Sequence, residues 1–475
     1  MVFSSLTFLI FFALVCAVMA MTNLAVLRDR PYIRTLRHCI LLAASYVFYG
    51  WWNWKCCFLM LGLTLAAYIF SLAYEKTERK LFVTLGVILP LVILGIFKYY
   101  NFFVDSFCTA FGIQRSGSLR ILLPVGISFY TFQSMSYTLD VYRGRIPAEH
   151  SFVRVALYVA FFPQLVAGPI VKAGEFLPQL NEDRNISFDN FAPGIQYFVF
   201  GLFKKLVIAD NIAVFVDAVY RNPAEFHALS VLLAVFAYSM QIYCDFSGYS
   251  DMAVGCARCL GYELTVNFDL PYLSKNVSEF WKRWHISLSS WLQQYLYIPL
   301  GGNRRGTVRT YVNLFLTMLI GGLWHGAAWT FVVWGGLHGL ALCVHKLYRK
   351  RRGKGENSAV GTALSVVGTF VFVSLCWVFF RAGSFDTAMR VFRAILTWQD
   401  GLLFVSSWAI FGIAAVTAAE LCALLRCRRN GTALKSYYPT VDLGSFRGLL
   451  IFFLALGLTL MLAYTGESPF IYFQF

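Results

Sequence analysis

Long apolar runs recur along almost the whole 475-residue chain, and short polar links separate them. Many of these runs approach the ~20 residues that a helix needs to cross a bilayer. Only helices and closed barrels satisfy every backbone hydrogen bond in lipid, and we find none of the alternating strands of about ten residues that a barrel needs. The pattern therefore predicts an all-α polytopic membrane protein with roughly eleven to thirteen transmembrane helices.

The charge distribution supports the membrane class and argues against nucleic acid as a partner. Only 13% of the residues are charged and 59% are hydrophobic. In soluble chains about a quarter of the residues are charged and about half are apolar. The formal net charge is +16, but Lys and Arg gather beside apolar runs, which is the positive-inside pattern. We expect residues 28–37, 75–80, 346–352 and 426–447 to be cytoplasmic, which places both termini outside.

No low-complexity linker and no clear repeat divides the sequence, so we expect one membrane domain over residues 1–475. Within it, residues 1–118 are the N-terminal helices and 119–345 the catalytic core. Residues 346–464 are the C-terminal helices and 465–475 an extracytoplasmic tail. The first apolar run has no basic residues before it, which favours a retained helix over a cleaved signal peptide.

The twelve cysteines lie mostly in apolar runs, where a free thiol behaves as a small hydrophobic group. Cys256 and Cys259 form a C-x-x-C pair, but no second pair accompanies it as a metal site would require. The sequence therefore predicts no metal site and no permanently bound cofactor.

His325 is the first of two histidines that stand out within apolar and glycine-rich sequence. It follows an apolar run of about 13 residues, roughly 20 Å of helix, which is shorter than a hydrocarbon core of about 30 Å. The imidazole would then lie at membrane depth, where an ionisable group indicates function. Gly321, Gly322 and Gly326 permit close approach of backbone or ligand. The alternative is a buried histidine that is hydrogen-bonded between helices.

His285 is the second, within the charged and tryptophan-rich segment Trp281–Trp291. This pattern is typical of an amphipathic segment at the interface that dips inward. The alternative is an ordinary interfacial anchor. His338 and His345 are weaker candidates, because His338 lies one turn past Trp334 and His345 joins a basic helix end.

These residues suggest acyl transfer. A histidine of near-neutral pKa can take a proton from a hydroxyl group as it attacks a thioester carbonyl. An acyl-CoA donor is polyanionic, and cations suit its phosphates. Cations lie at Lys282, Arg283, Arg304 and Arg305. Plain positive-inside topology is the alternative for each of them. Asp245 and Asp251, on the predicted helix Ala228–Cys259, are interpreted as structural hydrogen-bond partners.

Four segments resemble the membrane-bound O-acyltransferase (MBOAT) family, in the bacterial branch that O-acetylates alginate and peptidoglycan. They are Phe162–Ile170, Tyr243–Met252, Phe280–Asn303 and Gly321–Gly339. The resemblance implies re-entrant and interfacial helices in a ring around a central tunnel, with a cytoplasmic funnel for the donor and an outer funnel. It also implies that His325 is the catalytic residue and that His285 occupies the second signature position.

The resemblance further implies an extracytoplasmic SGNH-type O-acetyltransferase as a partner. The end of the chain, Phe470–Phe475, resembles the F-x-Y-x-x-F acyl-shuttle motif, which makes Tyr472 the expected carrier. A phenol is a better leaving group than an alkyl alcohol, so its ester stays transferable. At roughly 3.3 Å per residue the tail could reach some 20 Å from Gly466 toward His325. The alternative is an interfacial aromatic tail.

We therefore expect acetyl transfer from cytoplasmic acetyl-CoA, across a bacterial inner membrane, toward a polysaccharide of alginate or peptidoglycan type. The expected catalytic residues are His325, His285 and Tyr472, and those expected to bind the donor are Lys282, Arg283, Trp324, Arg304 and Arg305. Two alternatives stay open: an acyltransferase for a lipid or protein, and a transporter or channel, whose inverted repeats we do not find. The enzyme interpretation requires that His325 be reachable from both faces of the membrane.

Overall fold

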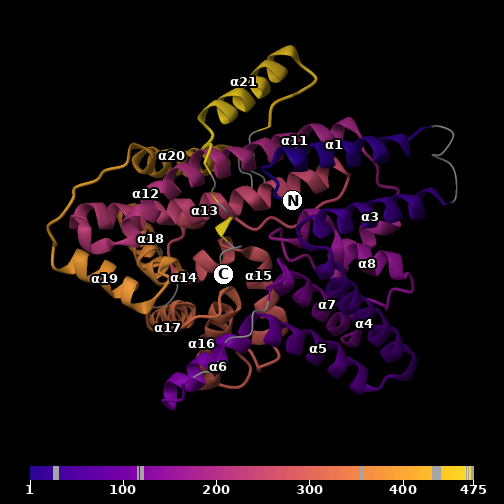
Figure 1. The fold of residues 1–475 in the computed structure, drawn as a ribbon, viewed down its shortest axis with the longest axis horizontal. Helices are drawn as coiled ribbons and strands as arrows, with labels where there is room; N and C mark the ends of the chain where they lie inside the picture. Colours follow the sequence, from indigo (N-terminus) through magenta and orange to yellow (C-terminus); the bar gives the residue numbers. More distant parts are fainter. Residues whose placement is uncertain are drawn as a thin grey trace. The chain divides into compact units, whose positions relative to one another are not determined.

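A computed structural model describes residues 1–24, 32–114, 117, 122–352, 358–430, 440–466, 468, 470 and 471 (Figure 1). These residues form helices, turns and loops, with no strand among them beyond one isolated bridge. Six of the described helices are long and apolar enough to cross a membrane, and two shorter apolar helices accompany them. The all-α membrane class is therefore confirmed, while the count of eleven to thirteen spans stays a prediction.

The chain divides into two compact units. Unit 1 comprises Met1–Val199 and Tyr249–Thr265, and unit 2 comprises Phe200–Gly248 and Val266–Phe475. The prediction of one membrane domain with four regions stays a prediction. Both candidate histidines, the predicted donor-binding cations and the tail belong to unit 2.

Unit 1 holds the N-terminal helices. They are α1 (Leu6–Met21), α3 (Ile33–Asn53), α4 (Lys55–Thr77), α5 (Lys80–Leu94), the π turn η1 (Gly95–Tyr99), α6 (Tyr100–Ala110), α7 (Ile127–Tyr142), α8 (Phe152–Ala160), α9 (Phe162–Leu165), α10 (Ala173–Phe176), the 3₁₀ turn η2 (Leu177–Asn181) and most of α11 (Phe188–Phe203). Helix α7 is buried along nearly its whole length and forms the centre of this unit.

Arg37, at the start of α3, is buried and paired within unit 1. It was counted in a basic cytoplasmic segment, but it lies in α3, is only 2% exposed and forms an ion pair with Asp183. Its Nε also donates to the Thr22 hydroxyl at 2.8 Å. A buried charge needs such partners, and the cytoplasmic placement of residues 28–37 stays a prediction. Arg28 and Arg30 lie outside the described residues.

Unit 2 holds the rest. Its elements are η3 (Lys204–Ala209, a π turn), α12 (Asp210–Arg221), η4 (Pro223–Glu225), α13 (Ala228–Cys259) as far as Gly248, η5 (Pro271–Leu273), α14 (Val277–Arg283), α15 (Ile286–Leu292), η6 (Gln293–Tyr297), α16 (Thr307–His325), α17 (Trp329–Arg352), α18 (Ala359–Arg381), α19 (Phe385–Leu396), α20 (Ser407–Asn430) and α21 (Phe446–Leu462). Helix α20 lies beside α12, as Figure 1 shows.

Helices α16 and α17 form a tight hairpin because glycines line their contact. A Cβ atom added at Gly322 would lie 2.3 Å from the Phe331 carbonyl oxygen, and one at Gly335 would lie 2.4 Å from the Met318 carbonyl oxygen. Any side chain at these positions would push the two helices apart. The close approach predicted from the glycines is confirmed at Gly322.

The length of α16 differs from the prediction. The helix begins at Thr307 and ends at His325, so it has 19 residues and spans about 28 Å. The helix is therefore longer than the apolar run of about 13 residues, while the placement of His325 at membrane depth stays a prediction. The burial of His325 depends on the side chains packed around it.

Candidate active site

His285 occupies an unusual backbone conformation at the turn between α14 and α15. Its φ of 44° and ψ of 56° are left-handed, which is uncommon for a residue other than glycine. Asn267 holds the turn: its carbonyl oxygen accepts from Ile286 N at 2.9 Å and its Oδ1 accepts from Ser287 N at 3.3 Å. Such strained residues concentrate at functional sites, and sequence reasoning did not single out Asn267.

The structure brings the two predicted histidines together. His285 is fully buried and His325 is 4% exposed, and their ring centroids are 6.2 Å apart. The Trp324 ring lies 6.1 Å from His285 and 5.0 Å from His325. Trp324 was predicted to bind the donor, and it is found as a shared wall of this histidine pair.

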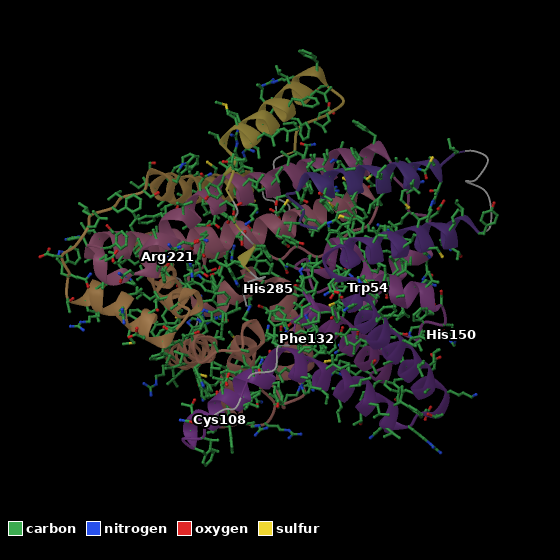
Figure 2. All side chains as sticks on the ribbon, viewed as in Figure 1. Trp54, Cys108, Phe132, His150, Arg221 and His285 are labelled. Atoms are coloured by element: carbon green, nitrogen blue, oxygen red, sulfur yellow. The ribbon has the colours of Figure 1, made fainter. Side chains whose placement is uncertain are left out.

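Aromatic rings contact both histidines, and Figure 2 marks the position of His285. His325 contacts Trp334 at 5.2 Å and Phe380 at 5.4 Å, while His285 contacts Phe246 at 4.7 Å between ring centroids. These three rings come from α17, α18 and α13. Phe246 and Trp334 lie in segments that resemble the family, but no spacing in the sequence predicts that these rings meet at the histidines, because they meet only when the helices pack.

A third histidine, His338, packs against Trp334, which contacts His325. The Nδ1 of His338 accepts a hydrogen bond from Trp281 Nε1 at 3.3 Å, and the His338 ring lies 5.0 Å from Trp334. His338 therefore supports Trp334, which in turn packs against His325. His345 is half-buried farther along α17.

The surroundings of His285 keep its ring neutral. Burial lowers the pKa of His285 to about 3, so the imidazole carries no charge near neutral pH. Neither ring nitrogen has a hydrogen-bond partner among the described residues. A neutral imidazole offers one donor and one acceptor, and both remain available to a substrate.

Two cavities of the protein lie away from the histidine pair. One cavity of about 310 Å³ lies in unit 2 and another of about 200 Å³ in unit 1, and neither is lined by His285 or His325. The tunnel and the access to His325 from both faces therefore stay predictions.

The predicted donor-binding cations differ in their surroundings. Lys282 is exposed, whereas Arg283 is engaged within the protein. Arg283 donates from Nη2 and Nε to Glu279 Oε1 at 2.8 and 3.1 Å, and from Nη1 to the Asp269 carbonyl oxygen at 3.1 Å. These bonds favour a structural role for Arg283, and its role in donor binding stays a prediction.

Arg304 and Arg305 are exposed in the segment before α16. The Arg305 side chain covers Gly301, where an added Cβ would lie 2.8 Å from the arginine Cδ. Both guanidinium groups remain suitable for phosphate contacts. Among the described residues, no group of three or more His, Cys, Asp or Glu side chains is arranged to hold a metal ion.

The C-terminal tail enters unit 2 close to the histidine pair. Phe470 is 1% exposed, and its ring lies 6.3 Å from Phe246, the same ring that contacts His285. Ile471 is 4% exposed. Tyr472, the predicted carrier, lies outside the described residues. The tail was expected to reach back toward the site, and its described part does so.

Comparison with known proteins identifies the family. The family model described as "MBOAT, membrane-bound O-acyltransferase family" matches residues 41–354. A probable alginate O-acetylase of Pseudomonas aeruginosa is 45% identical over 76% of this chain and 71% of its own length. A probable alginate O-acetylase of Azotobacter vinelandii is 39% identical over 92% of this chain and 95% of its own length. A peptidoglycan O-acetyltransferase of Helicobacter pylori is 39% identical over 75% of this chain and 73% of its own length. The chain therefore belongs to the membrane-bound O-acyltransferase family.

Proposed function

We propose that this O-acyltransferase moves an acetyl group from cytoplasmic acetyl-CoA across the bacterial inner membrane for O-acetylation of a cell-surface polysaccharide. The observation that carries the proposal is the buried pair His285 and His325, with ring centroids 6.2 Å apart inside an aromatic wall. The acceptors named for the relatives, alginate and peptidoglycan, support an acetyl group and a polysaccharide of that type.

Membership of an acyltransferase family makes the protein an enzyme, so the transporter alternative is wrong. The alternative of a lipid or protein acceptor stays open as a second acceptor class. The teichoic acid D-alanyltransferase of Bacillus subtilis, 28% identical over 55% of this chain, shows that this similarity extends to proteins named for another acyl group and another polymer.

His325 serves as the general base in the proposed reaction. The imidazole takes the proton of the Tyr472 phenol as the phenol oxygen attacks the thioester carbonyl. The new ester bond forms, the carbon–sulfur bond breaks and the proton passes to the CoA thiolate. General-base assistance of this kind typically contributes about 10²- to 10⁴-fold in rate. His285, neutral and adjacent, positions the phenol or relays the proton.

The exposed cations bind the acetyl-CoA donor in this proposal. Lys282, Arg304 and Arg305 suit the phosphates of CoA at the cytoplasmic side. Arg283 supports this region through its bonds to Glu279.

The C-terminal tail carries the acetyl group to the extracytoplasmic side in this proposal. Both termini are proposed to lie on the extracytoplasmic side, where an SGNH-type partner takes the acetyl group from Tyr472 onto its serine and then onto the polysaccharide. The burial of Phe470 beside Phe246 supports a tail that visits the histidine pair.

The test uses purified full-length protein in lipid nanodiscs with labelled acetyl-CoA and intact-mass analysis. Wild type should become acetylated on Tyr472, and His325→Ala should lose about 10²- to 10⁴-fold of the rate. Tyr472→Phe should retain no label and should release CoA only slowly, with water as the acceptor. Full labelling of His325→Ala would show that the base is elsewhere. Label on Tyr472→Phe would remove the carrier role and leave the enzyme activity standing.

A further inference from the structure

A buried ion triad lies in unit 2, apart from the histidine pair. It consists of Lys205, Asp210 and Asp245, which are 3%, 4% and 3% exposed. The Lys205 Nζ atom lies 2.7 Å from Asp210 Oδ1 and 2.7 Å from Asp245 Oδ1. Such a group is costly to bury unless every member is paired. The proposed chemistry does not use any of these three residues.

The local fold explains how two of these residues meet. Lys205 lies in the π turn η3, and Asp210 follows directly at the start of α12. The two residues are five apart, which matches the i→i+5 repeat of a π turn. Single π turns inside helices occur frequently at functional sites, so this irregular backbone indicates more than ordinary packing.

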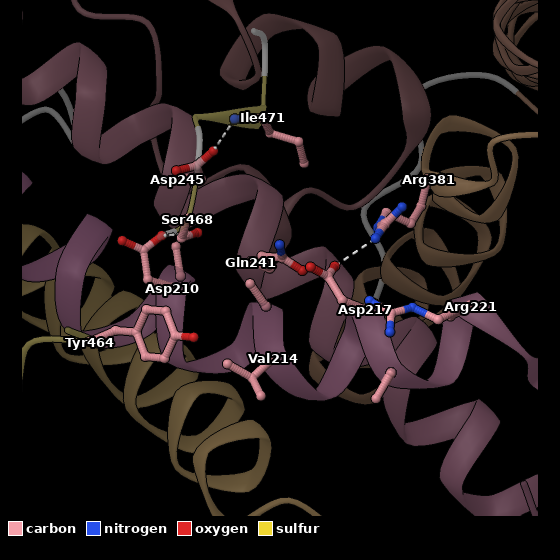
Figure 3. A pocket seen from close by; sticks show the side chains of 13 residues that line it. Asp210, Val214, Asp217, Arg221, Gln241, Asp245, Arg381, Tyr464, Ser468 and Ile471 are labelled. Carbon is pink, nitrogen blue, oxygen red and sulfur yellow. Dashed lines mark hydrogen bonds and ion pairs between the residues drawn. The ribbon is translucent and has the colours of Figure 1, made fainter. Parts of the chain in front are cut away.

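The triad binds the C-terminal tail through three hydrogen bonds, of which Figure 3 draws the two that Asp210 and Asp245 accept. The Ser468 hydroxyl donates to Asp210 Oδ1 at 2.8 Å, and Lys205 Nζ donates to the Ser468 carbonyl oxygen at 3.3 Å. The backbone N–H of Ile471 donates to Asp245 Oδ2 at 2.7 Å. Every member of the triad therefore contacts the tail directly.

We propose that Lys205, Asp210 and Asp245 are positioning residues for acyl transfer, forming a clamp that seats the C-terminal tail beside the histidine pair. The clamp fixes Ser468 and Ile471 on either side of Phe470, whose ring then rests on Phe246. The inference rests on the proposed carrier role of Tyr472, because that residue directly follows Ile471.

The clamp can also release the tail. Asp210, Asp245, Ser468 and Ile471 all line the cavity of about 310 Å³, which is open to the outside of the protein. Water entering this cavity can replace the tail's hydrogen bonds, while both carboxylates keep their ion pairs with Lys205. No buried charge is then left unpaired, and a carrier that alternates between two positions requires this property.

The cavity opens on the face that the proposed topology calls extracytoplasmic. Arg381 ends α18 and Tyr464 follows α21, and both line the cavity. Each helix begins after a basic segment, residues 346–352 for α18 and 426–447 for α21, that the positive-inside pattern places in the cytoplasm. The released tail would therefore leave toward the side where the proposed partner acts.

The experiment compares full-length variants in nanodiscs by hydrogen–deuterium exchange of the C-terminal peptide and by acetylation of Tyr472. Asp245→Ala should raise exchange of the Ile471 amide at least tenfold and lower Tyr472 acetylation at least tenfold. CoA release with water as acceptor should stay within twofold, since His325 is untouched. Asp245→Asn keeps an acceptor oxygen and should recover part of both losses. Asp217→Asn is the control: Asp217 lines the same cavity but bonds Arg381 at 2.6 Å, not the tail.

Two variants of the tail test the clamp without changing the buried triad, in case the triad variants do not fold. Ile471→Pro removes the N–H that donates to Asp245, and Ser468→Ala removes the hydroxyl that donates to Asp210. Both leave the triad intact, and both should lower Tyr472 acetylation while CoA release with water as the acceptor stays unchanged.

Unchanged amide exchange in Asp245→Ala would overturn the clamp. Faster exchange with unchanged acetylation would overturn its positioning role. A wild-type protein that never acetylates Tyr472 would instead overturn the proposed carrier, and the exchange comparison would still decide whether the clamp holds the tail.

Discussion

The histidine pair and the tail clamp both bury polar side chains in unit 2, but they satisfy them in opposite ways. His285 sits against aromatic rings, and its ring nitrogens have no hydrogen-bond partner among the described residues. Lys205 Nζ, in contrast, contacts two carboxylates and one carbonyl oxygen. Buried polar groups are normally paired. An unpaired neutral group indicates readiness for a substrate, and a fully paired charge indicates a structural or positioning role.

The largest effect that would test this contrast is on stability. Lys205→Met removes the cation and leaves Asp210 and Asp245 buried without their partner, which should lower the free energy of unfolding by about 3–5 kcal/mol. His285→Gln should leave the free energy of unfolding nearly unchanged but reduce acetyl transfer. Thermal unfolding in nanodiscs measures the first quantity and labelled acetyl-CoA the second. If both variants lose the same stability, the contrast between the two regions is wrong.

A smaller effect is expected at Asn267, which sharpens the comparison by separating geometry from chemistry. Asn267→Ala removes the acceptor of the Ser287 N–H and should lower stability by about 1–3 kcal/mol. It should also reduce kcat more than it changes KM, because the strained turn at His285 loosens. Asn267→Asp keeps an Oδ1 acceptor and should restore most of kcat. A change in KM alone would show that Asn267 does not position His285.

The smallest effect is expected at the exposed cations. Replacing Arg304 and Arg305 together with Gln should raise KM for acetyl-CoA a few-fold, since exposed charge interactions contribute about 0.2–1 kcal/mol each. The effect should shrink at high salt. Arg283→Gln is the matched variant: it should lower stability through lost bonds to Glu279, with little change in KM. A larger KM effect at Arg283 would reverse the assignment of these cations.

Local sequence was sufficient for the membrane class and for several helices. The predicted helix Ala228–Cys259 is found with the same bounds, because hydropathy and helix length depend on neighbouring residues. The glycines at the α16–α17 contact could also be recognised, since the absence of a side chain is visible in the sequence. The importance of His285 and His325 was suggested by their apolar surroundings and by family resemblance.

Other features could not be predicted, because they depend on residues that are far apart in the chain. The ion pair of Arg37 with Asp183 joins residues 146 positions apart, so the charge of Arg37 was visible in the sequence and its partner was not. Arg283 differs, because Glu279 and Asp269 lie only 4 and 14 residues away and could have been noticed in the sequence.

The sequence by itself determined that this chain is a helical membrane protein with two histidines in apolar surroundings. Only the tertiary structure decided that these histidines face each other and that a buried triad holds the tail. The physical reason is the separation along the chain of the residues that interact. Hydropathy acts along contiguous residues, whereas the bond from Ile471 to Asp245 joins positions 226 residues apart and exists only once the helices have packed.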